Sequence, residues 1–282
     1  MKITNKMNLP NVFVKIAEKT TYSSSKDSLS ATTLLLPAQE IVLRQRLDKE
    51  LEQDVSDMFN LLIGTALHDF IEKYDDSEFS EKYIYHYIGE QKITGKIDNY
   101  DEKTYSVIDY KTSKVSTILN NNFDDWEMQG KIYAWLLFKN KKWVEDIKFY
   151  AILKDWSSFA KKFKGADYPE EPVYLFQKRI TADDLKETEE FIKEKIDSVL
   201  KMKKMTNKEI LEEELPKEYQ PIVKYALMKK DSKRALSVTE DKEYAEWYAE
   251  RHEDVYIIEK FERNMKYDMI CKAHQLAKLK EE

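Results

Sequence analysis

The sequence predicts a mixed α/β (α+β) protein in which one sheet is flanked by helices. Three observations support this. Apolar and polar residues alternate at period two over residues 81–114, which is typical of half-buried strands. Apolar residues take helical spacing on either side of that stretch, over residues 30–74 and 124–138. Residues 224–263 then read as strand, strand, helix and strand, which predicts a small C-terminal module.

The N-terminal part divides into a polar stretch and a helical stretch. Residues 1–30 are rich in Ser, Thr and Lys without sustained periodicity, so we expect an arm with partial order. From Ser30 onward the helical spacing continues to residue 74, with interruptions at Pro37 and Gly64. The sequence therefore predicts two or three helices before the first long strand.

The central part predicts the sheet and the helix that covers it. Residues 81–114 are broken by Gly89 and by a polar turn around Glu102, which indicates an antiparallel meander of three strands. Residues 124–138 begin with two aspartates, which suit a helix N-terminus, and should cover the meander. Two further strands and a long charged helix are expected over residues 147–154, 173–180 and 182–205.

Length and pattern together suggest one large domain with an appendage. A chain of 282 residues can bury a full core and still carry a small module. We expect an arm over residues 1–30, a main domain over 31–210 and a C-terminal α+β extension over 211–282.

Composition restricts the protein's class and partners. The net charge of −6 argues against uniformly basic, phosphate-coating proteins, so any nucleic-acid contact must be local. Apolar runs such as 134–138 are too short to cross a bilayer and the start lacks a hydrophobic signal core, so we expect a cytoplasmic protein without a membrane partner. The single cysteine, Cys271, excludes an internal disulfide or an intrachain cysteine-ligated cluster. Any metal here must therefore use oxygen and nitrogen ligands.

Two acids and a lysine on neighbouring predicted strands form the candidate catalytic group. Asp109 and Lys111 are two apart on the third strand and share a face, whereas Tyr110 points the other way. We expect the turn near Glu102 to bring Asp98 opposite residues 106–108, so that its carboxylate can meet that of Asp109 on one cation. A lysine beside a metal can orient or deprotonate an attacking water. Taken alone, D-x-K in a strand also fits an exposed ion pair.

Two predicted helices offer further candidates. His68 follows Gly64 by one helical turn, and an imidazole can supply a nitrogen ligand, favouring manganese somewhat over magnesium. Gln129 and Tyr133 share a helix face and present an amide and a hydroxyl that can reach a phosphate, a base edge or the lysine. Each also fits an ordinary structural role, as a half-buried histidine or part of an amphipathic helix.

The order and spacing of these motifs resemble the PD-(D/E)XK nuclease superfamily, specifically its RecB-like branch. Four motifs stand in register over about a third of the chain: G-x-x-x-H (Gly64, His68), G-x-x-D (Gly95, Asp98), D-x-K (Asp109, Lys111) and Q-x-x-x-Y (Gln129, Tyr133). Residues 28–37 also resemble the family's opening helix.

The resemblance implies a restriction-endonuclease-like core that hydrolyses DNA phosphodiester bonds with Mg²⁺ or Mn²⁺. Metal ligands would be His68, Asp98, Asp109 and the main-chain carbonyl of Tyr110. Lys111 would be the catalytic lysine, acting with Asp98 and Asp109. Gln129 and Tyr133 would support substrate and active-site geometry. The substrate would be DNA, as single-stranded ends or linear duplex, and exonuclease action is expected ahead of endonuclease action.

Departures from the family refine this picture. Many RecB-like relatives carry four cysteines for an iron–sulfur cluster, but here Leu36 precedes Pro37 and only Cys271 remains, so no cluster is expected. Residues 224–249 resemble an extension of phage-type members. This implies a phage or mobile-element protein of the host cytoplasm, working in recombination, replication or DNA processing, with a protein partner from one of these processes.

Two other functions remain compatible with the sequence. One is a catalytically silent DNA-binding or assembly protein that keeps the fold and docks a partner through its tail. The other is an RNA-directed nuclease, because the active-site chemistry does not distinguish the sugars.

Overall fold

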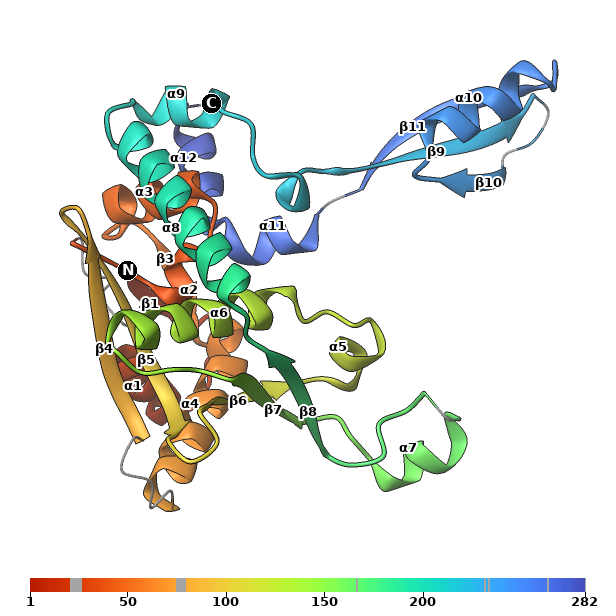
Figure 1. Cartoon of the computed structure of the whole chain (residues 1–282). Helices are drawn as coiled ribbons and strands as arrows, with labels where there is room; N and C mark the ends of the chain where they lie inside the picture. The colour runs from red at the N-terminus through yellow and green to blue at the C-terminus, as the bar shows by residue number, and fades with distance from the viewer. Residues whose placement is uncertain are drawn as a thin grey trace. The chain divides into compact units, whose positions relative to one another are not determined.

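The computed structural model shows a chain that divides into two compact units, Met1–Met205 and Thr206–Glu282 (Figure 1). The residues described are 1–20, 27–74, 80–165, 167–230, 232, 234–262 and 264–281. The expected boundary after residue 210 falls inside α9 (Asn207–Glu212). Thr206 and Glu209 form a capping box that starts this helix, and α9 packs on α12 of the second unit.

The first unit is built on a mixed sheet, as the sequence predicts. Its strand order is β2-β5-β6-β7-β8, with β4 paired to β5. The strands are β2 (Ser28–Ser30), β4 (Ser80–Ile88), β5 (Gln91–Asp101), β6 (Ser106–Ser113), β7 (Asp146–Leu153) and β8 (Val173–Arg179). The antiparallel meander of β4, β5 and β6 is confirmed, and β7 then pairs parallel to β6. This parallel step uses α6 as its crossover.

The two turns of the meander differ in length. Gly89 and Glu90 join β4 to β5, and Gly89 has a φ of 57°, which glycine adopts without strain. Residues 102–105 join β5 to β6, and the Asp101 carboxylate accepts hydrogen bonds from the Lys103 N–H and the Thr104 hydroxyl. This second loop sets the register that places the candidate acids.

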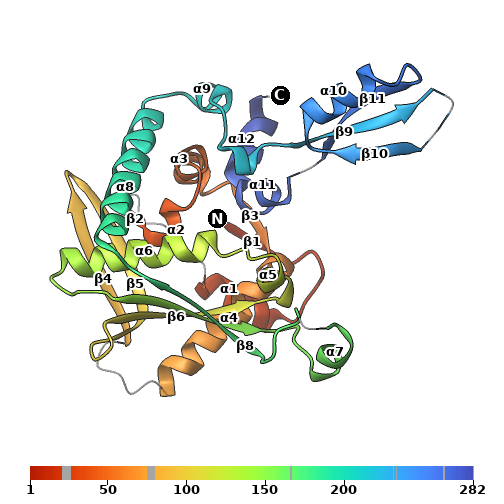
Figure 2. The same cartoon turned by 45° about the vertical axis from the view of Figure 1, so that its right-hand side comes forward.

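Helix α6 (Asp124–Lys139) covers the meander and packs closely on the sheet (Figure 2). At Gly130 an added Cβ would lie 2.6 Å from the Ile147 side chain and 2.9 Å from that of Phe149. At Gly95 an added Cβ would lie 3.0 Å from the Tyr133 ring. Glycine at these two positions therefore lets the helix and the sheet lie close together, and a larger residue at either one would push them apart.

The helices expected over residues 30–74 are present as α2 (Ala31–Leu34), α3 (Ala38–Leu47) and α4 (Val55–Tyr74). The Ser30 side chain caps α2 by accepting from the Thr33 N–H. Gly64 brings α4 close to β6, since an added Cβ would lie 3.2 Å from the Thr112 hydroxyl. This contact positions the α4 side chains that face the sheet.

Residues 1–30 fold differently from the expected arm. β1 (Lys2–Thr4) pairs with β3 (Glu52–Asp54), and α1 (Asn11–Thr20) buries Ala17 against α4. The Asp54 carboxylate fixes the turn after β1 by accepting from the Lys6 N–H and the Thr4 hydroxyl. The described part of this segment is thus a packed part of the first unit.

The long charged helix is confirmed as α8 (Ala182–Lys203). Thr181 and Asp184 form a capping box at its start, and the Asp184 carboxylate also lies 2.9 Å from the Lys131 ammonium of α6. Two short helices that the sequence did not predict complete this unit, α5 (Val115–Leu119) and α7 (Ser158–Phe163).

Asp184→Asn is expected to lower the free energy of unfolding by about 2 kcal/mol at pH 7. Burial opposes ionisation, but hydrogen bonds from Thr181 and Lys131 outweigh it and lower the pKa of Asp184 from 3.8 to about 2. The ionised Asp184 stabilises the folded chain fully above its ordinary pKa of 3.8, and this stabilisation is lost as the pH falls through about 2. The difference in free energy of unfolding between the parent chain and the variant should therefore disappear between these two pH values. Urea unfolding from pH 7 downward measures it. Asp183→Asn, on the exposed side, is the control.

The second unit contains the predicted strand, strand, helix and strand. Its sheet has the order β10-β9-β11, with α10 packed on it. Along the sequence, a short helix precedes the first strand of this sheet and two helices follow its last strand. The elements are η1 (Lys217–Tyr219), β9 (Ile222–Lys229), β10 (Ala235–Thr239), α10 (Lys242–Glu250), β11 (Val255–Glu262), α11 (Met265–Ile270) and α12 (Lys272–Glu281). None of the described helices in either unit combines the length and apolar composition that crossing a bilayer requires.

Candidate active site

The centre of the candidate site is an ion pair on β6. Asp109 is 2% exposed, and the Lys111 ammonium lies 2.7 Å from its Oδ2. The two residues share a face, as predicted, because they are two apart on a strand. The ring of Phe149 on β7 lies beneath the ammonium, 5.5 Å from its centroid. The lysine is therefore held between a buried carboxylate and an aromatic face.

Asp98 joins this pair from β5, in a register that differs from the expected one. Residues 106–108 lie opposite residues 99–101 rather than opposite Asp98. The physical reason is the loop over 102–105, which is longer than a tight turn centred at residue 102. Asp98 lies just beyond the residues of β5 that pair with β6, and its Oδ2 accepts a 2.8 Å hydrogen bond from the Tyr110 N–H. This brings Asp98 to the part of β6 that carries Asp109.

His68 reaches the same carboxylate from α4. Its Nδ1 lies 3.4 Å from the Asp98 Oδ2, and the ring is half-buried. The interaction with Asp98 raises the pKa of His68 above its ordinary value, although partial burial opposes the shift. The structure thus places an imidazole, a carboxylate and a backbone N–H within one local network.

The charge balance at Asp109 follows from its burial. Desolvation raises the pKa of Asp109 to about 6, the Lys111 ammonium opposes the rise, and the Asp98 charge adds to it. Two carboxylates near each other in a buried setting are costly unless a cation compensates them. Here Lys111 and His68 supply the compensating groups.

The donor set fits a hard divalent cation. The Asp109 Oδ2 is buried, and the group that balances its charge is the Lys111 ammonium at 2.7 Å. Carboxylate oxygens and an imidazole nitrogen are suitable ligands for Mg²⁺ or Mn²⁺. The residues pair as His68 with Asp98 and Asp109 with Lys111. No three His, Cys, Asp or Glu side chains in the described chain are gathered as a ready metal site.

Gln129 and Tyr133 form a buried pair on α6, above the sheet. The Gln129 side-chain amide donates a 2.7 Å hydrogen bond to the Tyr133 hydroxyl. Burial strongly raises the pKa of Tyr133, and the Asp109 charge raises it further, so this hydroxyl stays protonated. The predicted i, i+4 pairing is therefore present, with Tyr133 electrostatically linked to Asp109.

Tyr110 contributes through its backbone. Its N–H binds Asp98, while its ring stacks on Tyr150 at a centroid distance of 6.0 Å. Sequence reasoning missed this N–H donor and also the Phe149 ring beneath Lys111. The alternating pattern of β7 predicts that Phe149 is buried. It does not predict that Lys111 of the neighbouring strand lies over its ring.

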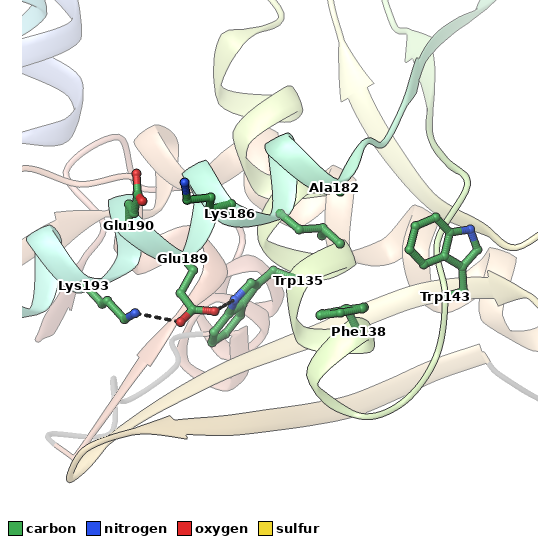
Figure 3. Close-up of a pocket in the computed structure, with 9 residues that line it drawn as sticks. Trp135, Phe138, Trp143, Ala182, Lys186, Glu189, Glu190 and Lys193 are labelled. Carbon is green, nitrogen blue, oxygen red and sulfur yellow. Dashed lines mark hydrogen bonds and ion pairs between the residues drawn. The ribbon is translucent and has the colours of Figure 1, made fainter.

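A separate groove lies between α6 and α8 (Figure 3). It has a volume of about 450 Å³ and a largely apolar lining that includes Trp135, Phe138 and Trp143. Glu189 accepts hydrogen bonds from the Trp135 indole and from Lys193 at its edge. None of the candidate site residues lines this groove, so it does not belong to the site described above.

Comparisons with known proteins find likeness in structure only. No family model and no curated protein matches the sequence. SSO0001 is 16% identical, covering 66% of this chain and 85% of that protein, with a TM-score of 0.48. An alkaline exonuclease from Laribacter hongkongensis is 12% identical, covering 63% and 92%, with a TM-score of 0.39. A phage-related exonuclease from Haemophilus somnus is 11% identical, covering 75% and 91%, with a TM-score of 0.31. Since these likenesses are weak, function has to be inferred from the site.

Proposed function

We propose that this chain is a metal-dependent DNA nuclease of the PD-(D/E)XK type, in the RecB-like branch. The observation that carries the proposal is the buried Asp109 carboxylate beside Lys111, with Asp98 and His68 converging from β5 and α4. Paired carboxylates next to an amine are what phosphodiester hydrolysis requires, since a cation must be held where negative charge grows.

Each site residue has a role in the proposed reaction. His68, Asp98, Asp109 and the Tyr110 carbonyl would hold Mg²⁺ or Mn²⁺, which supplies Lewis-acid stabilisation of the phosphoryl oxygens when bound. Lys111 orients the attacking water and, as the ammonium, pairs with a non-bridging oxygen. It can take up the proton of the water only as the neutral amine, after its own proton has passed to solvent. The Tyr110 N–H fixes the direction of the Asp98 carboxylate.

The ion pairs also indicate what these residues would do when the metal is bound. His68, Asp98 and Asp109 would hold the cation, whose positive charge would offset those of the two carboxylates. Lys111 would then be needed less to balance Asp109 and would be available to the water and the phosphate. His68 would ligate as the neutral imidazole.

Gln129 and Tyr133 support the substrate and the geometry around Asp109. Tyr133→Phe is expected to lower activity about tenfold, because it removes one hydroxyl hydrogen bond but keeps the ring that packs on Gly95. Initial rates with saturating metal measure the effect. Gln129→Ala should give a similar loss, and the double variant should be less than additive because the two residues act as one pair. Full additivity would contradict the shared role.

The proposal extends to substrate and setting. We infer an exonuclease acting on single-stranded ends or linear duplex, without an iron–sulfur cluster, in phage or mobile-element recombination, replication or DNA processing. A protein from one of these processes would be its second partner, and the host cytoplasm its location.

One experiment tests this function directly. Purified protein is incubated with labelled linear and circular, single- and double-stranded DNA and RNA, each with Mg²⁺, Mn²⁺ or EDTA. We expect metal-dependent degradation of linear DNA and none in EDTA. Degradation of RNA alone would instead support an RNA-directed nuclease. Cleavage of circles as fast as linear DNA would assign an endonuclease.

The runner-up is a catalytically silent DNA-binding or assembly protein. It is favoured by the way the candidate ligands are paired with each other, His68 with Asp98 and Asp109 with Lys111. Binding of DNA without cleavage in any metal would establish this alternative.

A further inference from the structure

One face of the β4–β5 hairpin carries three exposed aromatic rings. They are 55%, 49% and 52% exposed and belong to Tyr83, Tyr85 and Tyr87. The register with β5 is unbroken along them, so these alternate residues point to the same side. On the opposite side Ile84 is buried and His86 lies edge-on to Trp135 of α6. The hairpin thus has one packed face and one face of tyrosines.

Positive charge lies among these rings. Lys96 is directly opposite Tyr83 and Lys92 is directly opposite Tyr87, so both lysines share the face of the tyrosines. The Lys92 ammonium lies 4.4 Å from the Tyr85 ring centroid and 5.5 Å from that of Tyr83. In a chain with a net charge of −6, this is a local basic and aromatic surface.

We propose that this tyrosine face binds single-stranded DNA, with bases stacked on the rings and phosphates paired with the two lysines. The tyrosine face comprises Tyr83, Tyr85, Tyr87, Lys92 and Lys96. Aromatic side chains stack with any base, and a basic surface follows the backbone, which together bind single strands without sequence preference. The inference rests on the proposed nuclease function, whose substrate it narrows to a strand with unpaired bases.

The geometry favours unpaired over duplex DNA. The Tyr85 and Tyr87 ring centroids are 5.9 Å apart and the rings are inclined by 85°. Along each strand of a duplex, nucleotides follow at about 3.4 Å with parallel bases that are already stacked. Only a single strand can separate and turn its bases to meet rings at this spacing and inclination.

The face is continuous with the candidate active site along β5. Lys96 precedes Asp98 by two residues, which is about 7 Å along a strand. Away from the acids, Lys96 pairs with Tyr83, and the next pairs on the same face are Thr94 with Tyr85 and Lys92 with Tyr87. A strand bound on this face would therefore extend from the vicinity of the acids along the hairpin.

A structural role alone predicts something different. Cross-strand pairs of tyrosine and lysine stabilise a hairpin, and in that case the rings affect folding but not DNA affinity. Affinity measured without cleavage separates the two explanations.

The test measures binding of the full chain to fluorescein-labelled oligo(dT) and to a duplex of equal length by anisotropy, in EDTA. We expect tighter binding of oligo(dT) and a loss of at least about fivefold for each Tyr→Val change in the face, since valine keeps the strand preference but lacks a ring. Tyr→Phe should retain affinity. Lys92→Ala should lower the dependence of log affinity on log salt by about 0.7.

Tyr256→Val is the matched control, because Tyr256 is also an exposed strand tyrosine but belongs to β11 of the second unit. Native affinity in Tyr85→Val with an unchanged melting temperature would overturn the proposal, as would equal affinity for the duplex. If one Tyr→Val variant fails to fold, the other two single variants and Lys92→Ala keep the test decisive. Ring-dependent binding without cleavage in Mg²⁺ or Mn²⁺ would refute the nuclease alone, whereas cleavage with ring-independent binding would refute only the tyrosine face.

Discussion

Lys111→Ala is expected to lower the rate of DNA cleavage by about 10³-fold while leaving the fold intact. The ammonium is 2.7 Å from the Asp109 Oδ2 and lies over the Phe149 ring, so it is fixed beside the acids where water would be activated. Removing it eliminates the group that would accept the proton of the water as the neutral amine, or would stabilise the charge of the transition state as the ammonium. Initial rates on labelled linear DNA at saturating Mn²⁺ measure the effect.

Two further variants identify what the lysine does. Lys111→Arg keeps the charge but does not readily give up a proton, so it should remain severely impaired if proton transfer matters. Lys148→Ala is the matched control, because Lys148 lies on the adjacent β7 and points to the opposite face from Lys111. Equal rates in Lys111→Ala and the parent chain would rule out this residue as catalytic.

The sequence was sufficient to predict most of the sheet and the pairing of Asp109 with Lys111. Strand alternation fixes which residues share a face, so D-x-K at period two already places a carboxylate beside an amine. The position of Asp98 could not be predicted to the residue, because it depends on the length of the loop over 102–105. A shift of that loop changes which residue lies opposite Asp98.

The N-terminal part shows a second limit of sequence reasoning. Helix α1 is short, and its apolar residues make sense only against the α4 surface formed by Val55, Met58 and Leu62. β1 likewise depends on pairing with β3, which is distant in sequence. Such elements are stabilised by tertiary contacts rather than by their own periodicity, so their sequences look like polar linkers. The hydrogen bond from Tyr110 N–H to Asp98 is invisible for the same reason.

The second large effect is expected in metal-dependent stability. Mn²⁺ at about 100 times its dissociation constant should stabilise the folded chain by about 2.7 kcal/mol, which corresponds to a rise in melting temperature of roughly 5–10 °C. The reason is that the buried Asp109 oxygen and the Asp98 carboxylate gain a cation that offsets their mutual repulsion. Differential scanning fluorimetry with increasing Mn²⁺ measures the rise without requiring activity.

Asp98→Asn should abolish most of this rise, because an amide keeps the shape of the side chain but removes the charge that attracts the cation. Asp101→Asn is the matched control, since Asp101 ends the same strand and accepts hydrogen bonds from Lys103 and Thr104 of the following loop. An equal rise in Asp98→Asn and in the parent chain would mean that Mn²⁺ binds elsewhere, and the roles given to His68 and Asp109 as ligands would then fail together. A rise that depends on Asp98 but is accompanied by no cleavage would separate metal binding from catalysis and favour the assembly protein over the nuclease.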